Sequence, residues 1–594
     1  MTGIAGGAVD RSNLDAMVEA LHHEEWYASE EFWGGSYGLG MQHHGKKDPK
    51  GYTFWTDGQR AGAIDGAVSN LDELGWGTST VFENLRAAPE HTLDSLEGPF
   101  TIAYVDPSED RILLATDKIG SRPPAYTTEN GFAFGSGLGP LLPVLDDPVI
   151  DAQGVSDLLL MGHMWSDTTL LEEVRTLHPA TLLEYCDGEY TKRRYWHPEY
   201  EPVAPTDAYF HRLTNGFQLS VDRIAKSVTD DVGLWLSGGL DSRATLSELD
   251  RNLRNGAELD SLVAYTYDAN PGGEINPKLA REVARTLELP IETVPLTPDR
   301  FLPVMDKAID VTDGMVKLNT LVNLSAVFNI REYEPDILME GIVGELVGQH
   351  LSRYHITEAS SLVDSMYHSE ATLSTDQVRN LLDVDVDPLG SFRKEAQRTD
   401  ESSFEKAVVD VHYQNYYPRM VHASNPVPRS QTGTRIPYAD GDFLSLAARL
   451  PVSWRMGTFP FSDGELIYGV VKPKIRMMRA LDADLAEIPY ERSRLKPAHP
   501  YLLHVVGFFG ATALSQLRSQ PTYGGKSMVG EWYRSHDGFR ERIDDLIDGA
   551  CKRRFFNVDT VREYRRRHLQ GESDEMNVLG PIATFELWMR RNVD

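Results

Sequence analysis

The sequence has little of what secreted or membrane proteins contain. Only two cysteines, Cys186 and Cys551, occur among 594 residues, too few for a disulfide framework or a cysteine-rich zinc site. No run of about 18 apolar residues occurs, so no membrane span or membrane partner is expected. Residues 1–7 carry no basic side chain, which argues against a signal peptide. These absences predict a cytoplasmic protein.

Basic residues are scarce relative to acidic ones. The 58 Lys and Arg residues are outnumbered by 89 Asp and Glu residues, which gives a formal net charge of −31. An acidic surface repels phosphate backbones, so nucleic acid is not expected as a partner. Acidic residues spread along the whole chain are typical of halophilic proteins, because at 1 M salt the screening length is only about 3 Å. An ordinary acidic enzyme is the alternative interpretation.

A glycine turn between a strand and a helix is the most informative motif that is present. The apolar residues 232–236 predict a buried strand, and Ser237-Gly238-Gly239-Leu240-Asp241-Ser242 leads into a helix predicted over 242–254. Glycines in a tight turn or with positive φ angles would let backbone N–H groups approach an anion. Ser242 is expected to be the N-cap of the helix. A carboxylate beside a phosphate requires a cation between them, so Asp241 predicts bound Mg²⁺. The segment therefore predicts a phosphate-binding loop.

The chain changes character near residue 200. Residues 1–200 are predicted to be mainly β, including a hairpin around Asp187-Gly188, and Pro198, Pro202 and Pro205 mark a linker. Strands and helices then alternate: helix 206–228, strand 232–236, helix 242–254, strand 261–267, helix 276–288, strand 291–296, helix 318–332 and strand 336–340. This alternation predicts a parallel sheet whose ligands lie at the carboxyl ends of the strands. Residues beyond about 345 are predicted to be mostly helical.

The loop and several later segments resemble the asparagine synthetase family, which includes glutamine-dependent asparagine synthetases and β-lactam synthetases. Residues 338–348 resemble its second glycine-rich loop, but Gly344 replaces an Asp that usually helps to hold Mg²⁺. Glu340 or Glu345 could replace that ligand. Residues 435–440 (Arg-Ile-Pro-Tyr-Ala-Asp) resemble R-x-P-F-L-D. Lys472-Pro473-Lys474-Ile475-Arg476 resembles K-x-x-L-R, whose Lys faces the α-phosphate of ATP.

The N-terminal part resembles the family's glutaminase domain, with several changes in the pocket. Met1-Thr2-Gly3-Ile4 stands where the family has M-C-G-I, so Thr2 replaces the nucleophilic Cys. Asp65 stands where an Asn amide would stabilise an oxyanion, and Ala67 where a carboxylate would hold the α-amino group of glutamine. His44 replaces the Arg that would pair with the substrate carboxylate. We therefore expect the fold to be kept and glutamine hydrolysis to be lost.

The resemblance implies an α/β protein of three parts. These are an Ntn-type αββα glutaminase-like domain over 1–200, a parallel-sheet ATP-pyrophosphatase domain of the adenine nucleotide α-hydrolase type over 206–500, and a helical extension over 501–594. The implied activity is ATP-dependent amide formation by adenylation of a carboxylate, possibly aspartate, with ATP and Mg²⁺ as cofactors. The partners would be a small carboxylate substrate and an amine donor, possibly within a homodimer. Alternatives are an Ntn hydrolase using Thr2, and a nucleotide-binding homologue with impaired catalysis.

Roles follow from the matched positions. Asp241 and Glu345 would hold Mg²⁺, and Glu345 is also expected to be catalytic. Lys472 is the first candidate for the lysine that faces the α-phosphate, and Lys474 is the second. The residues expected to contact the nucleotide are Leu236, Ser237, Gly238, Gly239, Leu240, Asp241, Ser242, Thr266 and Gly341.

Overall fold

The computed structural model describes residues 2–228, 231–267, 275–341, 344–458, 467–517 and 528–594. Met1 of the N-terminal motif and residues 342–343 of the second glycine-rich loop lie outside these ranges. No helix among the described residues is long and apolar enough to cross a membrane.

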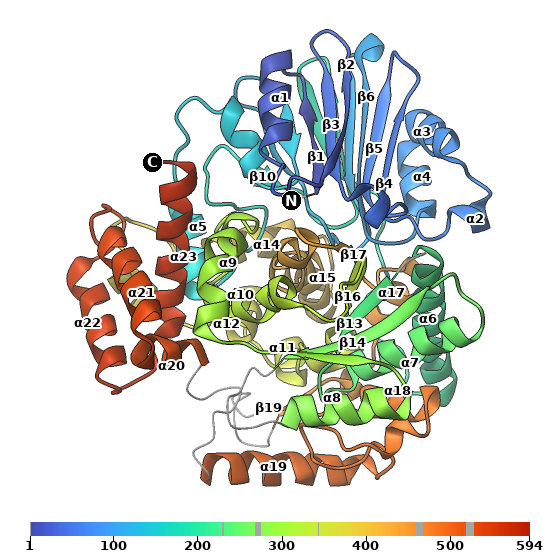
Figure 1. The fold of residues 1–594 in the computed structure, drawn as a ribbon, viewed down its shortest axis with the longest axis vertical. Coiled ribbons are helices and arrows are strands. Elements are labelled where there is room, and N and C mark those ends of the chain that lie inside the picture. The colour runs from blue at the N-terminus through green and yellow to red at the C-terminus, as the bar shows by residue number, and fades with distance from the viewer. Residues whose placement is uncertain (1, 229–230, 268–274, 342–343, 459–466, 518–527) are drawn as a thin grey trace.

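The N-terminal part contains two antiparallel sheets of six strands each, at the top of Figure 1. The first sheet has the order β10-β8-β9-β1-β3-β2. Its strands are β1 (Gly3–Gly7), β2 (Ala28–Trp33), β3 (Gly38–His43), β8 (Ala125–Thr127), β9 (Ala133–Gly135) and β10 (Arg175–Thr176). The second sheet has the order β12-β11-β7-β6-β5-β4. Its strands are β4 (Tyr52–Thr56), β5 (Ala61–Gly66), β6 (Phe100–Asp106), β7 (Arg111–Thr116), β11 (Thr181–Cys186) and β12 (Glu189–Arg194).

The two sheets pack face to face between helices. Buried side chains from both sheets, among them Ile4, Leu39, Ala63 and Leu114, form the core between them. Helix α1 (Arg11–Glu19) covers the outer face of the first sheet, and α3 (Thr78–Ala87) and α4 (Pro89–Ser95) cover the second. The short helix α2 (Leu71–Leu74) precedes α3. The αββα layering expected from the resemblance is confirmed.

A parallel five-stranded sheet with the order β15-β14-β13-β16-β17 forms the centre of the molecule. Its strands are β13 (Asp231–Trp235), β14 (Ser261–Tyr267), β15 (Ile291–Val294), β16 (Ile337–Glu340) and β17 (Gly433–Arg435). The central strand β13 is apolar at successive positions because helices cover both faces of such a sheet. The predicted strands and crossover helices are confirmed, with ends shifted by a few residues. Helix α10 (Leu318–Leu324) is shorter than predicted, because a 3₁₀ turn over Ser325–Asn329 follows it.

Helices surround this sheet and make up most of the later chain. Those of the parallel-sheet part are α6 (Asp207–Lys226), α7 (Asp241–Arg254), α8 (Ile275–Thr286), α9 (Pro298–Asp310), α10, α11 (Arg353–Thr357), α12 (Leu362–Glu370), α13 (Thr375–Leu381), α14 (Gly390–Arg398), α15 (Phe404–Tyr416), α16 (Pro426–Arg429), α17 (Gly441–Ala448) and α18 (Lys472–Leu481). A small antiparallel pair, β18 (Gly457–Thr458) and β19 (Ile467–Tyr468), lies between α17 and α18 in the chain.

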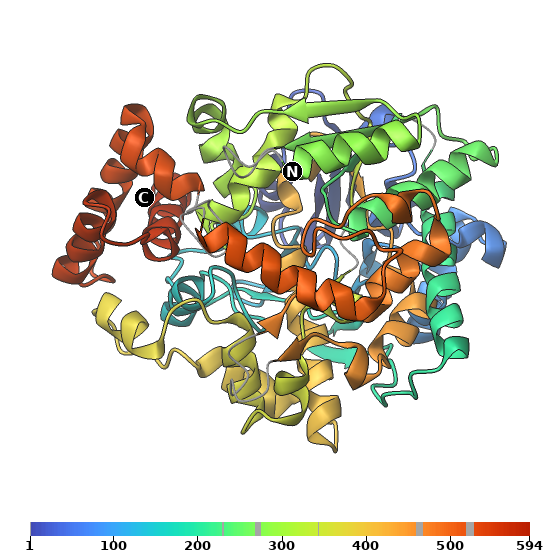
Figure 2. The ribbon, with the colours of Figure 1, turned by 90° about the horizontal axis from the view of Figure 1, so that it is seen from below.

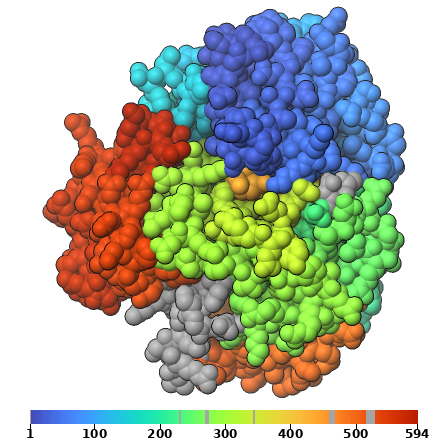
Figure 3. All heavy atoms as spheres, viewed as in Figure 1, coloured from blue at the N-terminus to red at the C-terminus, as the bar shows by residue number. Residues whose placement is uncertain are grey.

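The C-terminal helices are α19 (Tyr501–Leu517), α20 (Met528–Ser535), α21 (Asp537–Ala550), α22 (Val558–Leu569) and α23 (Met576–Asn592). Helix α19 lies across the underside of the parallel-sheet part (Figure 2), while α20–α23 form a lobe at the side (Figure 3). Helix α23 is buried against α5 (Ala152–Leu160), α9 and α10. The Thr584 hydroxyl of α23 accepts a hydrogen bond from the backbone N–H of Leu318. The C-terminal lobe is therefore packed into the main core.

A buried ion pair joins the N-terminal and parallel-sheet parts. The guanidinium of Arg435, at the end of β17, binds both carboxylate oxygens of Asp48 at 2.7 and 2.9 Å. The Arg435 side chain is fully buried, and it also donates to the backbone oxygen of Ser227. A bidentate, charge-assisted pair of this kind sets orientation as well as distance. The Arg-x-Pro segment therefore fixes the N-terminal part on the edge of the parallel sheet.

Candidate active site

The segment after β13 forms a compact loop against the start of α7. The Ser237 N–H donates to Ser242 Oγ at 3.1 Å, and the Gly239 N–H donates to Ser237 Oγ at the same distance. The two hydroxyl oxygens lie 3.1 Å apart. The loop therefore closes on itself at the N-terminal end of α7, where the helix dipole favours a negative charge.

Two details of this loop differ from the sequence prediction. Leu240, not Ser242, occupies the N-cap position, and Asp241 is the first residue of α7. Ser242 lies inside the first turn and uses its hydroxyl to brace Ser237. Neither Gly238 nor Gly239 has a positive φ angle. Gly238 is required instead by crowding, because a Cβ there would lie 2.8 Å from the Asn276 side chain and 3.0 Å from that of Leu279.

The second glycine-rich segment packs directly on the first. A Cβ on Gly341 would lie 2.3 Å from the Cα of Ser242, so only glycine permits this approach. A Cβ on Gly344 would lie 2.6 Å from Asp241 Oδ2, 2.6 Å from Gln349 Oε1 and 2.8 Å from Lys474 Nζ. The three polar groups thus converge on the position where the family usually carries an Asp side chain.

Lys474 and Lys472 are placed very differently. The buried Lys474 Nζ donates to Asp241 Oδ2 at 2.6 Å and to Gln349 Oε1. Burial disfavours the ammonium form, but the Asp241 carboxylate raises the pKa of Lys474 above its usual range. Lys472, at the start of α18, is exposed. Geometry therefore brings Lys474, and not Lys472, to the phosphate loop.

Two further carboxyl groups, those of Glu345 and Glu340, each have one buried oxygen without a hydrogen-bond partner in the described part of the chain. Glu345 Oε2 and Glu340 Oε1 are buried and accept no hydrogen bond from the described residues. Burial raises the pKa of Glu340 to about 7. Burial, together with the nearby charge of Asp241, also raises the pKa of Glu345. The orphaned oxygen of Glu345, whose charge interacts with that of Asp241, fits a cation site, because hard divalent cations take oxygen ligands. Glu340 lines a small cavity with His422 and Arg435.

The structure adds two residues that the sequence did not indicate. Glu491 follows an irregular segment and lies over the loop, with its backbone N–H donating to the Gly238 oxygen. Arg243 of α7 is fully buried and donates to the backbone oxygens of Leu485, Ile488 and Pro489. This guanidinium ties residues 485–491 to the phosphate loop. No local motif predicts the contact, because its partners are more than 240 residues away in sequence.

Thr266 lies near the carboxyl end of β14, beside the strand that precedes the phosphate loop. Its side chain is buried, and the N–H of Leu236 donates to the backbone oxygen of the preceding Tyr265 at 2.6 Å. Parallel pairing of β13 with β14 places Trp235 opposite Tyr265. With Gly341 after β16, the residues expected to contact a nucleotide therefore lie at the ends of three adjacent strands, β14, β13 and β16.

The pocket expected for glutamine is filled by ion pairs. Asp65 is buried, and its two carboxylate oxygens face Arg122 at 2.7 Å and Arg429 at 3.6 Å. The space left beside Thr2, Asp65 and His44 amounts to about 10 Å³. A volume of about 10–15 Å³ accommodates a single water molecule, not an amino-acid side chain. His44 is held by the backbone oxygen of Arg429 at 2.9 Å.

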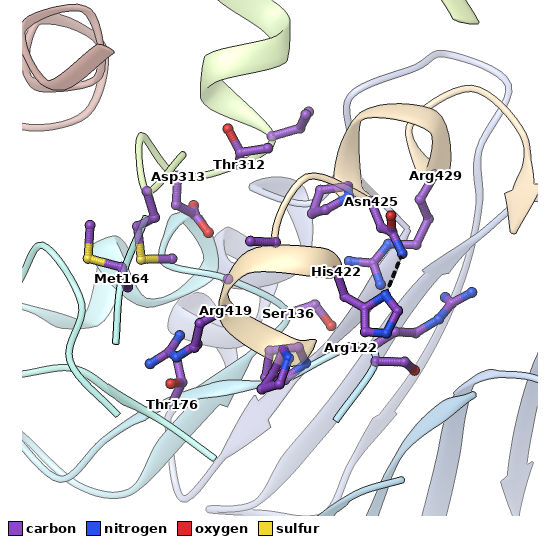
Figure 4. Close-up of a pocket in the computed structure, with 18 residues that line it drawn as sticks. Arg122, Ser136, Met164, Thr176, Thr312, Asp313, Arg419, His422, Asn425 and Arg429 are labelled. Atoms are coloured by element: carbon purple, nitrogen blue, oxygen red, sulfur yellow. Dashed lines mark hydrogen bonds between the residues drawn. The ribbon is translucent and has the colours of Figure 1, made fainter. Parts of the chain in front are cut away.

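A cavity of about 70 Å³ lies between the N-terminal and parallel-sheet parts, lined by Arg122 and Ser136 on one side and Asp313, Arg419 and His422 on the other (Figure 4). Its guanidinium groups already have partners: Arg419, for example, donates to the backbone oxygens of Ser166 and Thr168. Burial raises the pKa of Asp313 to about 7 and lowers that of His422 to about 3. The cavity contains none of the phosphate-loop residues.

Comparisons with known proteins agree with this arrangement. Residues 77–196 match the family model for the glutamine amidotransferase domain, and residues 215–465 match that for asparagine synthase. The chain is 30% identical over 160 residues to asparagine synthetase [glutamine-hydrolyzing] 3 of Bacillus subtilis (strain 168). That match spans 26% of this chain and only about a quarter (26%) of the relative's length.

Two solved structures also match. The allosteric regulatory enzyme of purine biosynthesis covers 49% of this chain and 80% of its own, at 9% identity and a TM-score of 0.25. Glutamine phosphoribosylpyrophosphate amidotransferase from B. subtilis covers 68% of this chain and 94% of its own, at 11% identity and a TM-score of 0.24. TM-scores this low carry no argument about the fold. On the two domain matches and the Bacillus relative, the chain belongs to the asparagine synthetase family.

Proposed function

We propose that this protein is an ATP-dependent ligase that activates a carboxylate as an acyl-adenylate and transfers the acyl group to an amine. The observation that carries the proposal is the convergence of Asp241, Lys474 and Gln349 at Gly344, beside the phosphate loop. An ammonium group and a carboxylate at the N-terminal end of a helix are the groups that polyphosphate chemistry requires.

In the first step, a carboxylate oxygen of the substrate attacks the α-phosphorus of ATP, and the bond to the pyrophosphate oxygen breaks. The loop over residues 237–242 and the start of α7 would bind the departing pyrophosphate. Lys474 would donate to the α-phosphate oxygens, on which negative charge develops. In the second step the amine attacks the acyl carbon, AMP leaves, and the amine nitrogen loses a proton. The acidic residues near the loop could accept that proton.

Asp241 and Glu345 are the residues that would hold Mg²⁺, with Glu340 as a third oxygen donor. Their fit to a cation is supported by the buried, unpartnered oxygens of Glu345 and Glu340. Bound Mg²⁺ would supply charge neutralisation of the phosphates. Because Gly344 offers no side chain, the family's usual Asp ligand has no direct replacement at that position.

The amine is proposed to be ammonia from solution or a partner protein, or an amino group of the substrate itself. The Asp65 ion pairs with Arg122 and Arg429 support this choice, since they occupy the place where glutamine would bind. Thr2 borders only the small residual space. An Ntn hydrolase acting through Thr2 is therefore not favoured by any of these contacts.

One observation favours a second candidate, a nucleotide-binding homologue with impaired catalysis. Lys474 lies directly on Asp241, so an ammonium group already neutralises the carboxylate proposed to bind metal. In a working ligase this pair must exchange partners when Mg²⁺ and ATP bind. In an impaired homologue it would persist, and ATP would bind without turnover.

The test compares Asp241→Asn with Asp250→Asn, a substitution in the same helix at a carboxylate that pairs with Arg254. Pyrophosphate release is measured with ATP, Mg²⁺, ammonium and a panel of carboxylates including aspartate. We expect Asp241→Asn to lower the rate by about 100-fold or more, as for loss of a group that stabilises developing charge. Asp250→Asn should change it by less than about twofold. Equal rates for both variants would refute the assignment.

A further inference from the structure

A second group of polar side chains lies on the other side of the Glu345–Gln349 turn. His350 ends this turn, Glu370 is the last residue of α12, and His412 lies in the middle of α15. Each offers one ligand atom, and the three atoms lie within 4.8 Å of one another. These residues share no sequence motif, and their positions converge only in the folded chain.

The two separations from the Glu370 carboxylate are compatible with a metal site. His350 Nε2 lies 2.9 Å and His412 Nδ1 lies 3.6 Å from Glu370 Oε1. Metal–ligand bonds of about 2.0–2.1 Å in a tetrahedron place neighbouring ligand atoms about 3.3 Å apart. The two observed separations bracket that value.

The ligand atoms are buried, and the two imidazole nitrogens have no hydrogen-bond partner among the described residues. His412 and Glu370 side chains are each 3% exposed, and that of His350 is 14% exposed. Neither His350 Nε2 nor His412 Nδ1 makes a hydrogen bond with the described residues, despite their closeness to Glu370. Buried polar atoms are nearly always satisfied, so two such nitrogens aimed at one carboxylate require an explanation.

Neighbouring groups orient the ligands as outer-shell partners do in metal sites. Ser369 Oγ lies 3.4 Å from His412 Nε2, so the Nδ1 atom of His412 remains available as a ligand. The same Ser369 hydroxyl donates a hydrogen bond to Glu370 Oε1 at 2.9 Å. The His350 ring stacks on Tyr416, with ring centroids 3.4 Å apart. His163 faces the other Glu370 oxygen at 3.7 Å, and its Nδ1 is bonded to the Met164 backbone oxygen.

A cavity supplies room for a fourth ligand. It has a volume of about 30 Å³ and is lined by His350 and His412 on one side and by Glu345 and Arg455 on another. A volume of about 10–15 Å³ is enough for one ordered water molecule. Two imidazoles, one carboxylate and a water form a donor set that Zn²⁺ accepts.

We propose that His350, Glu370 and His412 bind a Zn²⁺ ion, with water in the fourth position. The ion joins the turn that carries Glu345 and Gln349 to α12 and α15, and so positions one wall of the ATP site. This site is separate from the proposed Mg²⁺ site and does not depend on the proposed ligase activity. The competing explanation is a metal-free ion pair between a His350 imidazolium and Glu370.

The experiment uses the full chain, stripped with a chelator and titrated with Zn²⁺ in the absence of nucleotide. We expect one tightly bound equivalent per chain. Loss of an outer-shell partner typically weakens metal binding by about 10–100-fold, and Ser369→Ala should weaken Zn²⁺ binding by about tenfold. The substitutions His412→Gln and Glu370→Gln remove ligands, so each should weaken Zn²⁺ binding by more than about 100-fold. The matched controls are His368→Gln, at the exposed histidine of the same helix α12, and Asp241→Asn at the ATP site; both should bind as the wild type does.

A spectroscopic measurement keeps the test decisive if a variant fails to fold. Co²⁺ added to the stripped wild-type chain should give the intense visible bands of a four-coordinate site, and one equivalent of Zn²⁺ should abolish them. The proposal is overturned if the wild-type chain binds no stoichiometric Zn²⁺, if Co²⁺ gives only the weak bands of the hydrated ion, or if folded His412→Gln binds as tightly as wild type. Any of these results would leave the ion pair between His350 and Glu370 as the explanation of this cluster.

Discussion

Lys474 Nζ and Asp241 Oδ2 lie 2.6 Å apart, on either side of the space that a side chain on Gly344 would enter. The contact exists because Gly344 has no side chain: a Cβ there would lie 2.6 Å from the carboxylate and 2.8 Å from the ammonium group. The residue that departs from the family pattern is thus the one that lets the lysine reach the phosphate loop. The charge of Asp241 is balanced by this lysine.

The first prediction concerns the two lysines of α18. Lys474→Ala should lower the rate of pyrophosphate release by about 100-fold or more, because it removes the cation closest to the developing charge. Lys472→Ala, two residues away and exposed, should change the rate by less than about twofold. Steady-state kinetics with saturating ATP distinguish the two. A large loss in Lys472→Ala with a small one in Lys474→Ala would reverse the assignment.

The second prediction concerns Glu340, whose pKa is raised by burial from 4.5 to about 7. Between pH 4.5 and about pH 7, Glu340 holds a proton in the folded protein that it has already released in the unfolded chain. The free energy of unfolding therefore falls as the pH rises through this range. Above about pH 7 both states are deprotonated, and the loss does not increase further. Glu340→Gln mimics the protonated form. At pH 8 it should raise the free energy of unfolding by on the order of 1–3 kcal/mol while weakening Mg²⁺-dependent activity.

Urea unfolding of Glu340→Gln and wild type at pH 5 and pH 8 checks this result. The two proteins should differ at pH 8 and converge at pH 5. Equal midpoints at pH 8 would mean that the carboxylate carries no burial penalty in the folded protein.

The third prediction concerns the N-terminal pocket. Thr2→Cys restores the family's nucleophile but leaves Asp65 paired with Arg122 and Arg429. We expect glutamate release from glutamine by Thr2→Cys to equal that by Thr2→Ala, since the substrate has no place to bind. Glutaminase activity in Thr2→Cys well above the Thr2→Ala level would show that the pocket opens.

The fourth prediction concerns the junction between the N-terminal and parallel-sheet parts. Arg435→Ala leaves the buried Asp48 carboxylate without its partner and should cost about 3–5 kcal/mol of stability. Arg566→Ala removes an exposed guanidinium paired with Glu563, and it should leave the stability close to that of the wild type because exposed ion pairs are screened by solvent. Thermal unfolding of both variants measures the difference. Similar losses would mean that the Arg435–Asp48 pair does not hold the parts together.

The strands and the phosphate loop could be predicted because their signals are local. The apolar residues before Ser237, the two glycines and the helix that follows are adjacent in sequence, and β13, α7 and β14 lie where they were expected. The N-cap was misplaced by two residues, because Leu240 already has helical backbone angles and the helix begins at Asp241.

The choice between the two lysines could not be made from spacing alone. Lys472 is four residues before Arg476, so the two lie on the same face of α18. That face is turned outward: Arg476 covers the Phe210 ring at 4.0 Å and pairs with Asp207, whose side chain is 82% exposed. Lys474 lies on the opposite, buried face. The role of Arg243 was likewise unpredictable, because its partners follow α18 in the chain and reach the loop only through tertiary packing.

Several expectations stay predictions, among them the domain boundaries, the homodimer, the cytoplasmic location and the adaptation to high salt. The substrate carboxylate, aspartate or another, also stays open.

The most direct test of the central claim is ATP–pyrophosphate exchange by the wild-type chain, with labelled pyrophosphate, Mg²⁺ and a panel of carboxylates but no amine. We predict that label enters ATP only when a particular carboxylate is present, because reversible adenylation requires that partner. Tight ATP binding without exchange for any carboxylate, or cleavage of ATP to ADP and phosphate, would contradict the account.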